Sequence, residues 1–403
     1  MNRPPPGTVP ESDDLLDTPP ETWNDVEVSR LSEWHVPTPS LRELVQAIEA
    51  HQCVAIVGES GVGKSATLAA LARPELTKGA VPADFLHAII VLNPSISLED
   101  LATLLADQLL RNVAGFEEAQ SQFCVTTTYE QRQSFDPLFR EVAGPLRLLP
   151  GDPVRIAIDG SDQVAPEIWS PIHELYNLLA THPALPFIRL IVTERSFERV
   201  PPRAHILELP LPDEKSLRRY CSKRGLAANV AAQVAATAGG AWLCAKLAGE
   251  MAALDPALIE RWKPAQTATE VCVSALGILV AKDPERWRAT LQPVLAALAA
   301  AGAGPVLPVA LLQVAAEGLG CRLELSELQA ALIDLAPFIA RAQISGQPER
   351  LGVSHEALAR VLLDAQAGGD LSVDPSAAHA AILGAIDRLA PLDKFDFAEG
   401  DAL

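Results

Sequence analysis

Short apolar runs alternate with helical patterns through the first half of the chain. Each run is rich in aliphatic residues, as strands buried in a parallel sheet are. The runs cover residues 53–57, 87–93, 154–158, 187–192 and 205–209. Helical spacing of apolar residues appears over 31–50 after a cap at Ser40, from the capping box Ser97 to Asp100 onward, and over 167–180. The alternation predicts an α/β fold with a parallel sheet, whose ligand lies at the carboxyl ends of the strands.

The second half of the chain has a mostly helical pattern. Helical periodicity dominates from residue 213 to about residue 335. Two short extended runs follow at 339–344 and 350–353, and another helical pattern comes after them. Two helices, a small hairpin and a further helix predict a winged-helix arrangement over about 305–366. A last helix is predicted over 375–389, and we find no internal repeat of fixed period.

Charge and composition narrow the class of protein. The formal net charge is -19, which argues against a nucleic-acid partner bound mainly through phosphate contacts. The chain starts without a secretory signal, and the apolar run 271–281 is too short to span a bilayer, so we expect a cytoplasmic protein without a membrane span. The most basic segment, 215–224, fits a solvated helix face. The cysteines lack metal-ligand spacing, as is usual in a reducing compartment: Cys53, Cys124, Cys221, Cys244, Cys272 and Cys321.

A glycine-rich loop follows the first predicted strand. Its sequence is GESGVGKS, from Gly58 to Ser65, and it opens a helical pattern near Lys64. Gly58, Gly61 and Gly63 let the backbone take a tight path, partly at positive φ, that turns successive N–H groups inward toward a phosphate. Lys64 supplies a charge for the β and γ phosphates, and Ser65 supplies a hydroxyl ligand for magnesium. The strand before the loop and the helix after it are the context that a phosphate-binding loop requires.

Polar side chains end the next strands of the predicted sheet. The third run delivers Asp159 to the rim, where a P-loop NTPase holds magnesium opposite the Ser65 hydroxyl. Asp162 fits either a carboxylate that orients the attacking water or a helix cap. Thr193 and Arg195 end the neighbouring strand, where side chains can sense the γ phosphate, although an exposed loop position is the alternative for Arg195.

These segments together resemble the nucleotide-binding core of the STAND signalling ATPases, and they are most similar to the NACHT and apoptotic-ATPase branches. The matching stretches, spread over about residues 40–390, are GESGVGKS, IAIDGSDQ, IRLIVTERS, LELPLPDEKSL, TAGGAWLCAKL and GVSHEALARVLL. The resemblance implies that Arg195 is a sensor of the nucleotide. It also implies that His355 contacts the diphosphate of bound ADP and latches a closed state, whereas a helix cap or a surface histidine is the alternative for His355.

Two positions depart from the family pattern. Gln163 stands where an acidic residue is frequent, which puts efficient hydrolysis in doubt. Trp242 stands where the family often has a proline near adenine, so Trp242 either stacks on the base or belongs to the core.

The motifs and the resemblance together define a predicted site for ATP or ADP with Mg²⁺. We expect catalytic roles for Asp159, Asp162 and Arg195, and magnesium ligands in Ser65 and Asp159. The residues expected to bind the nucleotide are Gly58, Glu59, Ser60, Gly61, Val62, Gly63, Lys64, Ser65, Ala66, Trp242 and His355.

At 403 residues the chain exceeds one hydrophobic core, so several domains are expected. They are a disordered acidic, proline-rich tail (1–27), a P-loop NTPase domain (28–210), a helical domain (211–300), a winged-helix domain (301–370), and a C-terminal helix with an acidic tail (371–403).

The leading hypothesis is an ATP/ADP-binding switch that hydrolyses ATP slowly, is latched by ADP, and oligomerises or signals with ATP. Its effector and sensor parts are expected on further domains or on partner chains. The alternative is an AAA+ initiator-type ATPase that binds or remodels DNA through its winged helix. The corresponding helix, 325–335, carries Glu327 and Asp334 and no Lys or Arg, which disfavours DNA. A small-molecule kinase also has a P-loop, but rarely such a long helical C-terminal half.

Overall fold

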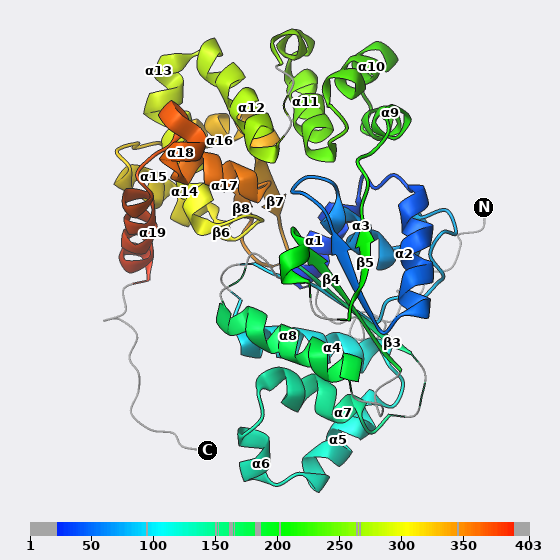
Figure 1. Ribbon diagram of the computed structural model, residues 1–403. Coiled ribbons are helices and arrows are strands. Elements are labelled where there is room, and N and C mark those ends of the chain that lie inside the picture. Colours follow the sequence, from blue (N-terminus) through cyan, green and yellow to red (C-terminus); the bar gives the residue numbers. More distant parts are fainter. Residues whose placement is uncertain are drawn as a thin grey trace, which may run out of the picture.

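A five-stranded parallel sheet forms the centre of residues 22–208 (Figure 1). The strands are β1 (Cys53–Val57), β2 (Ala88–Val91), β3 (Val154–Asp159), β4 (Ile188–Glu194) and β5 (His205–Glu208), and their order in the sheet is β2-β3-β4-β1-β5. The computed structural model describes residues 22–93, 96–149, 151, 153–160, 164, 166–181, 187–200, 203–262, 265, 267–344 and 346–390. The predicted α/β fold with a parallel sheet is confirmed.

Helices cover both faces of this sheet, because successive side chains of a strand point to opposite faces. One face packs on α2 (Pro39–Ala50) and α3 (Lys64–Leu71), through a core that includes Leu41, Ile56 and Leu68. The other face packs on α4 (Leu98–Asn112) and α8 (Pro166–Thr181) (Figure 1). The segment between α4 and β3 adds α5 (Phe116–Thr126), α6 (Tyr129–Gln133), a π-helical turn (Phe139–Ala143) and α7 (Gly144–Leu146). We call residues 22–208 the α/β unit.

Two predictions at the start of the chain are wrong. The single helix predicted over 31–50 is instead two, α1 (Trp23–Ser32) and α2, and α2 begins at Pro39 with Thr38 as its N-cap. Proline fits the first turn of a helix because the N–H that it lacks has no intrahelical partner there. Ser40 therefore lies inside α2 rather than at its cap. The disordered tail was predicted to reach residue 27, but residues 23–27 are the first half of α1.

The second half of the described chain is largely helical. It contains α9 (Glu214–Lys223), α10 (Ala228–Thr237), α11 (Trp242–Leu254), α12 (Ala268–Lys282), α13 (Pro284–Arg286), α14 (Gln292–Ala301), α15 (Val309–Gly318), α16 (Leu325–Asp334), α17 (Glu356–Leu363), α18 (Ala365–Gly368) and α19 (Pro375–Leu389). Between these helices lies a small antiparallel sheet of β6 (Leu307–Pro308), β7 (Ile339–Ala342) and β8 (Arg350–Val353), in the order β6-β8-β7. The predicted hairpin is thus confirmed as β7 and β8.

Residues 213–389, which we call the C-terminal body, share one apolar core. Buried side chains form a continuous cluster from Leu217 in α9 through Leu276 in α12 to Leu358 in α17. The two faces of the α/β unit have their own cores. Separating α9–α12 from α14–α19 would expose this shared core, which is unfavourable in water. No helix in the described part of the chain is both long and apolar enough to cross a membrane.

Side-chain amides cover the exposed edge of the sheet at β2. The Asn24 side chain donates to Ile89 O and accepts from Val91 N, at 2.8 and 2.9 Å. The Gln108 amide accepts from Ile89 N at 2.8 Å and donates to Ile89 O at 2.9 Å. Asn112 donates to His87 O at 2.8 Å. Helices α1 and α4 thereby satisfy backbone groups that a further strand would otherwise pair with.

We predict that Gln108→Met lowers the free energy of unfolding by about 1–3 kcal/mol, because it leaves buried backbone groups of Ile89 without the amide. Chemical denaturation measures the change. Gln329→Met is the matched control, since Gln329 is an exposed helical glutamine. Equal stability of the two variants would contradict a role for the amide at this edge.

Candidate functional site

The glycine-rich loop lies between β1 and α3, as the motif requires. Gly61 and Gly63 have φ of 87° and 97°, in the left-handed region that favours glycine. Gly58 is required for a different reason, because a Cβ on it would lie 2.9 Å from Val62 Cγ2. Lys64 Nζ donates to Gly58 O at 2.6 Å and to Glu59 O at 3.1 Å. The loop therefore has the curvature and the ammonium group of a phosphate cradle.

Asp159 and Thr193 form a buried pair at the carboxyl edge of the sheet. Asp159 is 3% exposed and Thr193 is 1% exposed. Thr193 Oγ1 donates to Asp159 Oδ1 at 2.6 Å and accepts from Gly160 N at 2.9 Å. The hydroxyl thus fixes the orientation of the carboxylate at the carboxyl end of β3.

The residues at this edge fit a Mg²⁺ ion bound with nucleotide. Asp159 closes β3, Ser65 lies in the first turn of α3, and α3 packs against β3. A carboxylate and a hydroxyl are hard oxygen donors of the kind that Mg²⁺ accepts alongside phosphate oxygens. Ser65 and Asp159 would hold the ion, and the ion would supply charge neutralisation at the phosphates.

A carboxylate from the C-terminal body lies against the loop. Glu356, the first residue of α17, accepts from Ser60 Oγ at 2.8 Å through Oε1. Its other oxygen, Oε2, forms an ion pair with Arg195, which follows β4 directly. The Glu356 and Arg195 side chains are 23% and 29% exposed, so water screens this pair less than it screens a surface pair. One carboxylate therefore joins the phosphate loop, the predicted sensor and the C-terminal body.

His355 lies beside this carboxylate and caps α17. Its Nδ1 accepts from Ala357 N at 3.1 Å, so Nδ1 carries no proton and the ring is neutral. Burial, together with neighbouring positive charges, lowers the pKa of His355 to about 3. Those charges belong to Lys246, Arg195, Lys64 and Arg30. His355 is thus a helix cap and also a neighbour of the phosphate loop.

Helix α11 packs its first residues directly on the loop. A Cβ on Gly63 would lie 2.8 Å from Trp242 Cδ1, and one on Gly61 would lie 2.9 Å from Leu243 Cβ. Leu243 N also donates to Gly61 O at 3.3 Å. Trp242 is half-buried and meets Tyr220 edge to face, with ring centroids 5.7 Å apart. These contacts place Trp242 directly against the loop.

The structure brings most of the predicted site residues together. The loop from Gly58 to Ala66, Asp159, Arg195, Trp242 and His355 all lie at or beside the carboxyl edge of the sheet. Asp162 and Gln163 lie outside the described residues. Sequence reasoning missed Glu356. Its place directly after the predicted latch histidine was a signal, because adjacent residues at a helix N-terminus reach the same surroundings.

The basic segment of α9 is only partly a solvated face. Arg218 pairs with Glu214 on the surface. Lys223 instead donates to Glu33 O and His35 O, at 2.9 and 3.2 Å. These two bonds join the C-terminal body to the loop between α1 and α2.

The comparisons with known proteins agree with this geometry. Residues 47–200, less than half of the chain, match the family model described as an AAA domain. A STAND protein with a tetratricopeptide repeat sensor from Pyrococcus horikoshii is similar in structure, with a TM-score of 0.51 and 11% identity, over 88% of this chain and 46% of that one. No curated protein matches.

Two further solved structures are similar at lower TM-scores. A Walker-type ATPase from Pyrococcus abyssi has a TM-score of 0.37 and 14% identity, over 79% of this chain and 93% of that one. Cdc6p from Pyrobaculum aerophilum has a TM-score of 0.38 and 14% identity, over 90% of this chain and 98% of that one. The chain has a P-loop NTPase fold with a parallel five-stranded sheet and a largely helical remainder, and the match to an AAA domain is confined to residues 47–200.

The depressed pKa of His355 gives a prediction about pH. An unfolded histidine titrates near its ordinary pKa of 6.5, whereas folded His355 stays neutral down to about pH 3. Protons therefore bind the unfolded chain first, and folded stability falls as the pH drops from 6.5 toward 3. His355→Asn keeps an N-cap acceptor and cannot titrate in this range.

We expect the melting temperature of His355→Asn to fall less than that of the wild type between about pH 7 and pH 5. Thermal unfolding followed by circular dichroism measures both. His35, whose pKa burial and Lys223 lower to about 4, contributes the same background slope to the two proteins. If the melting temperatures of the two proteins fell equally with pH, His355 would not be enclosed among these cations.

Proposed function

Because the chain carries an AAA-class P-loop ATPase domain, we propose that it is a nucleotide-controlled switch, in which ADP holds the C-terminal body closed over the phosphate loop and ATP with Mg²⁺ releases it. We interpret α15 to α17 with β6 to β8 as a winged helix. The observation that carries the proposal is the double contact of Glu356 with Ser60 and Arg195.

The chemistry of this contact supports sensing of the terminal phosphate. Arg195 follows the strand next to β1, at the edge where the phosphates of a nucleotide on this loop would lie. A γ phosphate and the Glu356 carboxylate are both anions, so they compete for one guanidinium. ADP has no γ phosphate and leaves the Glu356 contact in place. Binding of ATP favours the state in which Glu356 has left Arg195.

The division of the apolar cores supports movement of the C-terminal body as one piece. Its helices share a single core, whereas its contacts with the phosphate loop, among the described residues, include the polar Glu356–Ser60 bond and the packing of Trp242 and Leu243. Opening along this boundary exposes little apolar surface, so the two states can lie within a few kcal/mol of each other. We propose that opening uncovers a surface for self-association, and that slow ATP hydrolysis resets the closed state. The signal input and output belong to further domains or partner chains.

We predict that Glu356→Gln releases bound ADP about 10- to 100-fold faster than the wild type, because the amide keeps the size of the side chain but loses its charge toward Arg195. Release of a fluorescent ADP analogue, chased with unlabelled ADP, measures the rate. Lys64→Ala is expected to retain no nucleotide, so it gives the background signal of this assay.

Glu349→Gln is the matched control for this variant. Glu349 also pairs with an arginine, Arg341, at 3.5 Å, and both members of this pair lie in the hairpin of the C-terminal body. We expect the control to release ADP at the wild-type rate. If Glu356→Gln also released ADP at the wild-type rate, the latch would be contradicted.

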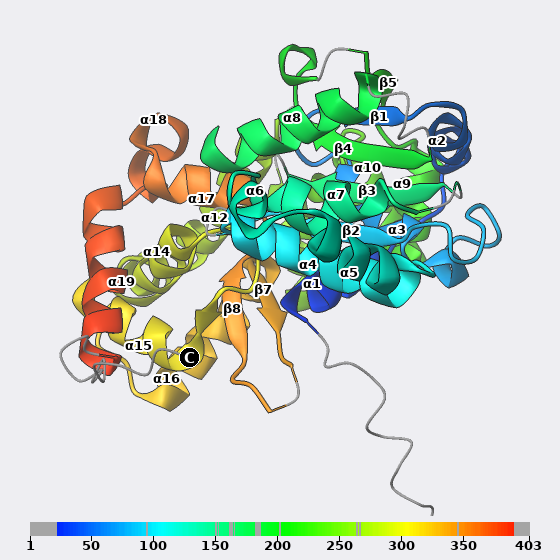
Figure 2. The ribbon, with the colours of Figure 1, turned by 90° about the horizontal axis from the view of Figure 1, so that it is seen from below.

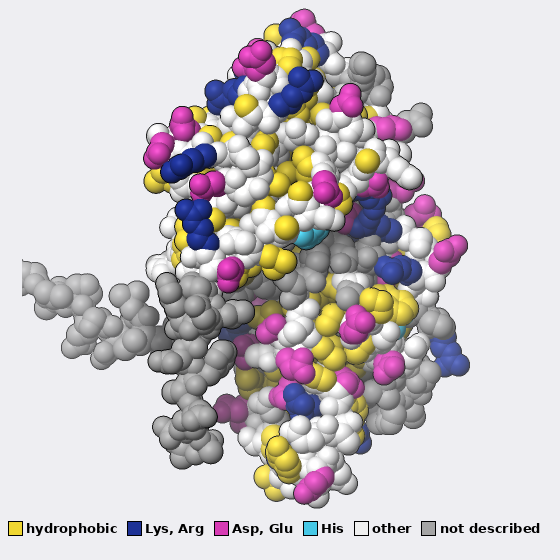
Figure 3. All heavy atoms as spheres, turned by 90° about the vertical axis from the view of Figure 1, so that its left-hand side faces the viewer, with side chains coloured by type: hydrophobic (Ala, Val, Ile, Leu, Met, Phe, Trp, Pro, Cys, Tyr) yellow, Lys and Arg dark blue, Asp and Glu magenta, His cyan; other side chains and the backbone are white. Residues whose placement is uncertain are grey.

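An initiator-type ATPase acting on DNA is the second candidate, because a P-loop domain followed by a winged helix suits both functions. The exposed side chains of α16 include Glu324 at its cap, Leu325 and Glu327. On the face of the molecule in Figure 3, Lys and Arg side chains are interspersed with Asp and Glu rather than gathered in one patch. A DNA-binding face would be basic.

We therefore predict no specific affinity for duplex DNA. Fluorescence anisotropy with a labelled duplex at about 50 and 200 mM salt checks this, since phosphate contacts make binding strongly salt-dependent. Tight binding that weakens steeply with salt would favour the initiator function.

A further inference from the structure

Helix α1 connects the two bodies of the molecule. It lies across the β2 edge of the α/β unit, and Figure 2 shows it beside β7 and β8 of the C-terminal body. A capping box of Thr22 and Asp25 fixes its start. The sequence alone assigned the first half of this helix to a disordered tail, so its role has to come from its contacts.

The apolar side of α1 belongs to the α/β unit. Val28 is 6% exposed and lies in the core formed with α2 and α3, and Leu31 packs against the same core. Asn24 binds the backbone of β2 on both sides of Ile90. Ser29 Oγ accepts from Arg73 Nη1 at 3.1 Å. When the two bodies separate, α1 therefore stays with the α/β unit.

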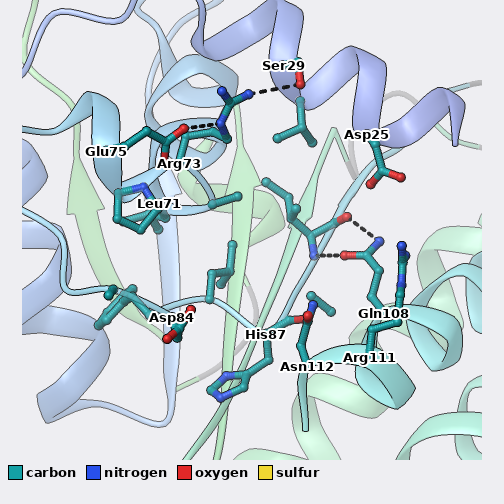
Figure 4. A pocket seen from close by; sticks show the side chains of 18 residues that line it. Asp25, Ser29, Leu71, Arg73, Glu75, Asp84, His87, Gln108, Arg111 and Asn112 are labelled. Carbon is teal, nitrogen blue, oxygen red and sulfur yellow. Dashed lines mark hydrogen bonds and ion pairs between the residues drawn. The ribbon is translucent and has the colours of Figure 1, made fainter. Parts of the chain in front are cut away.

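The packing of α1 on the α/β unit is not continuous. A groove of about 790 Å³ runs beneath it, between α1, the end of α3 and α4. Figure 4 shows Arg73 reaching Ser29 on one side of this groove and Gln108 reaching the β2 backbone on the other. Discrete side-chain contacts hold the helix in this region.

The other side of α1 contacts the C-terminal body through charged and aromatic groups. The Arg350 guanidinium of β8 lies over the Trp23 ring, 4.1 Å from its centroid. Glu27 and Arg30 form a bidentate pair, with distances of 2.5 and 2.7 Å. This pair interacts electrostatically with Lys246 and Glu250 of α11.

The loop after α1 continues the same bridge. Lys223 of α9 binds the carbonyl groups of Glu33 and His35, and the Arg224 guanidinium lies over the Trp34 ring at 5.5 Å. The segment 23–35 thus contacts β8 and the end of α9 and interacts electrostatically with α11, and its described residues do not belong to the core of the C-terminal body. Such contacts can break and re-form without exposing a hydrophobic core.

We propose that α1 and the loop after it form an autoinhibitory clasp, anchored in the α/β unit, which holds the C-terminal body closed by the Trp23–Arg350 and Lys223 contacts independently of the nucleotide. The inference deepens the proposed switch, because it adds a second restraint to the one that Glu356 provides. A factor that draws α1 away from the body would favour opening even with ADP bound.

Hydrogen exchange of the Leu243 amide tests the clasp without nucleotide. This amide donates to Gly61 O across the boundary between the two bodies, and it lies in the first turn of α11, where an N–H has no intrahelical partner. Its exchange therefore reports how often the bodies separate. We expect Trp23→Ala and Arg350→Ala each to speed this exchange by roughly 2- to 30-fold, the range that corresponds to one cation–π contact. The double variant is expected to add little to either one.

Two further variants keep the test specific. Arg341→Ala removes an arginine from β7 of the same hairpin, where it pairs with Glu349, and we expect wild-type exchange from it. Lys223→Ala removes the second contact and is expected to speed exchange independently of Trp23 and Arg350. Exchange of β1 amides shows that each variant remains folded.

The outcomes separate the clasp from the nucleotide latch. Wild-type exchange at Leu243 in Trp23→Ala, Arg350→Ala and Lys223→Ala would overturn the clasp, whatever Glu356→Gln does. Faster exchange in these variants alongside wild-type ADP release from Glu356→Gln would support the clasp and contradict the latch. Additive effects of Trp23→Ala and Arg350→Ala would also count against the clasp, because they would show that the two residues do not act through one contact.

Discussion

The contact between Glu356 and the phosphate loop is the interaction on which the closed arrangement depends most. It is a single carboxylate that binds Ser60 of the loop and Arg195 of the neighbouring strand. Charge holds this contact together, and charge is also what a nucleotide changes when its γ phosphate is present or absent. In the proposed switch, the site where the two bodies meet is also the site where phosphates bind, so that binding and closure are parts of one equilibrium.

The rest of the fold makes this equilibrium possible. Apolar residues are concentrated within each body, in two cores around the sheet and one core through the C-terminal helices. Opening of the boundary, as proposed, would leave the packing within each of these cores in place. Helix α1 follows the same rule, because Val28 anchors it in the α/β unit while Trp23 reaches Arg350 on the other body.

Local features of the fold could be predicted from the sequence, and distant contacts could not. The strands were found because buried parallel strands appear as short aliphatic runs, and the phosphate loop because its glycines, Lys64 and Ser65 lie at fixed spacing. Helix α1 was missed because the acidic, proline-rich stretch before it dominated the composition, while its anchors are few. Glu356 was missed because its partner Ser60 lies 296 positions away, and its place next to His355 indicates only that it lies near the site, not which residue it binds. The sequence predicts a loop that is partly at positive φ, and the structure assigns this to Gly61 and Gly63, whereas the constraint at Gly58 is the packing of Val62.

The distance between the two bodies as a function of bound nucleotide tests the central claim most directly. Cys124 on α5 is exposed and the other described cysteines are buried, so a spin label on Cys124 and one on Leu383→Cys, an exposed position of α19, report this distance. Double electron–electron resonance would compare the full chain with ADP and with a non-hydrolysable ATP analogue and Mg²⁺. The account predicts one short distance with ADP and a longer, broader distribution with the analogue. The same distribution with both nucleotides would contradict it.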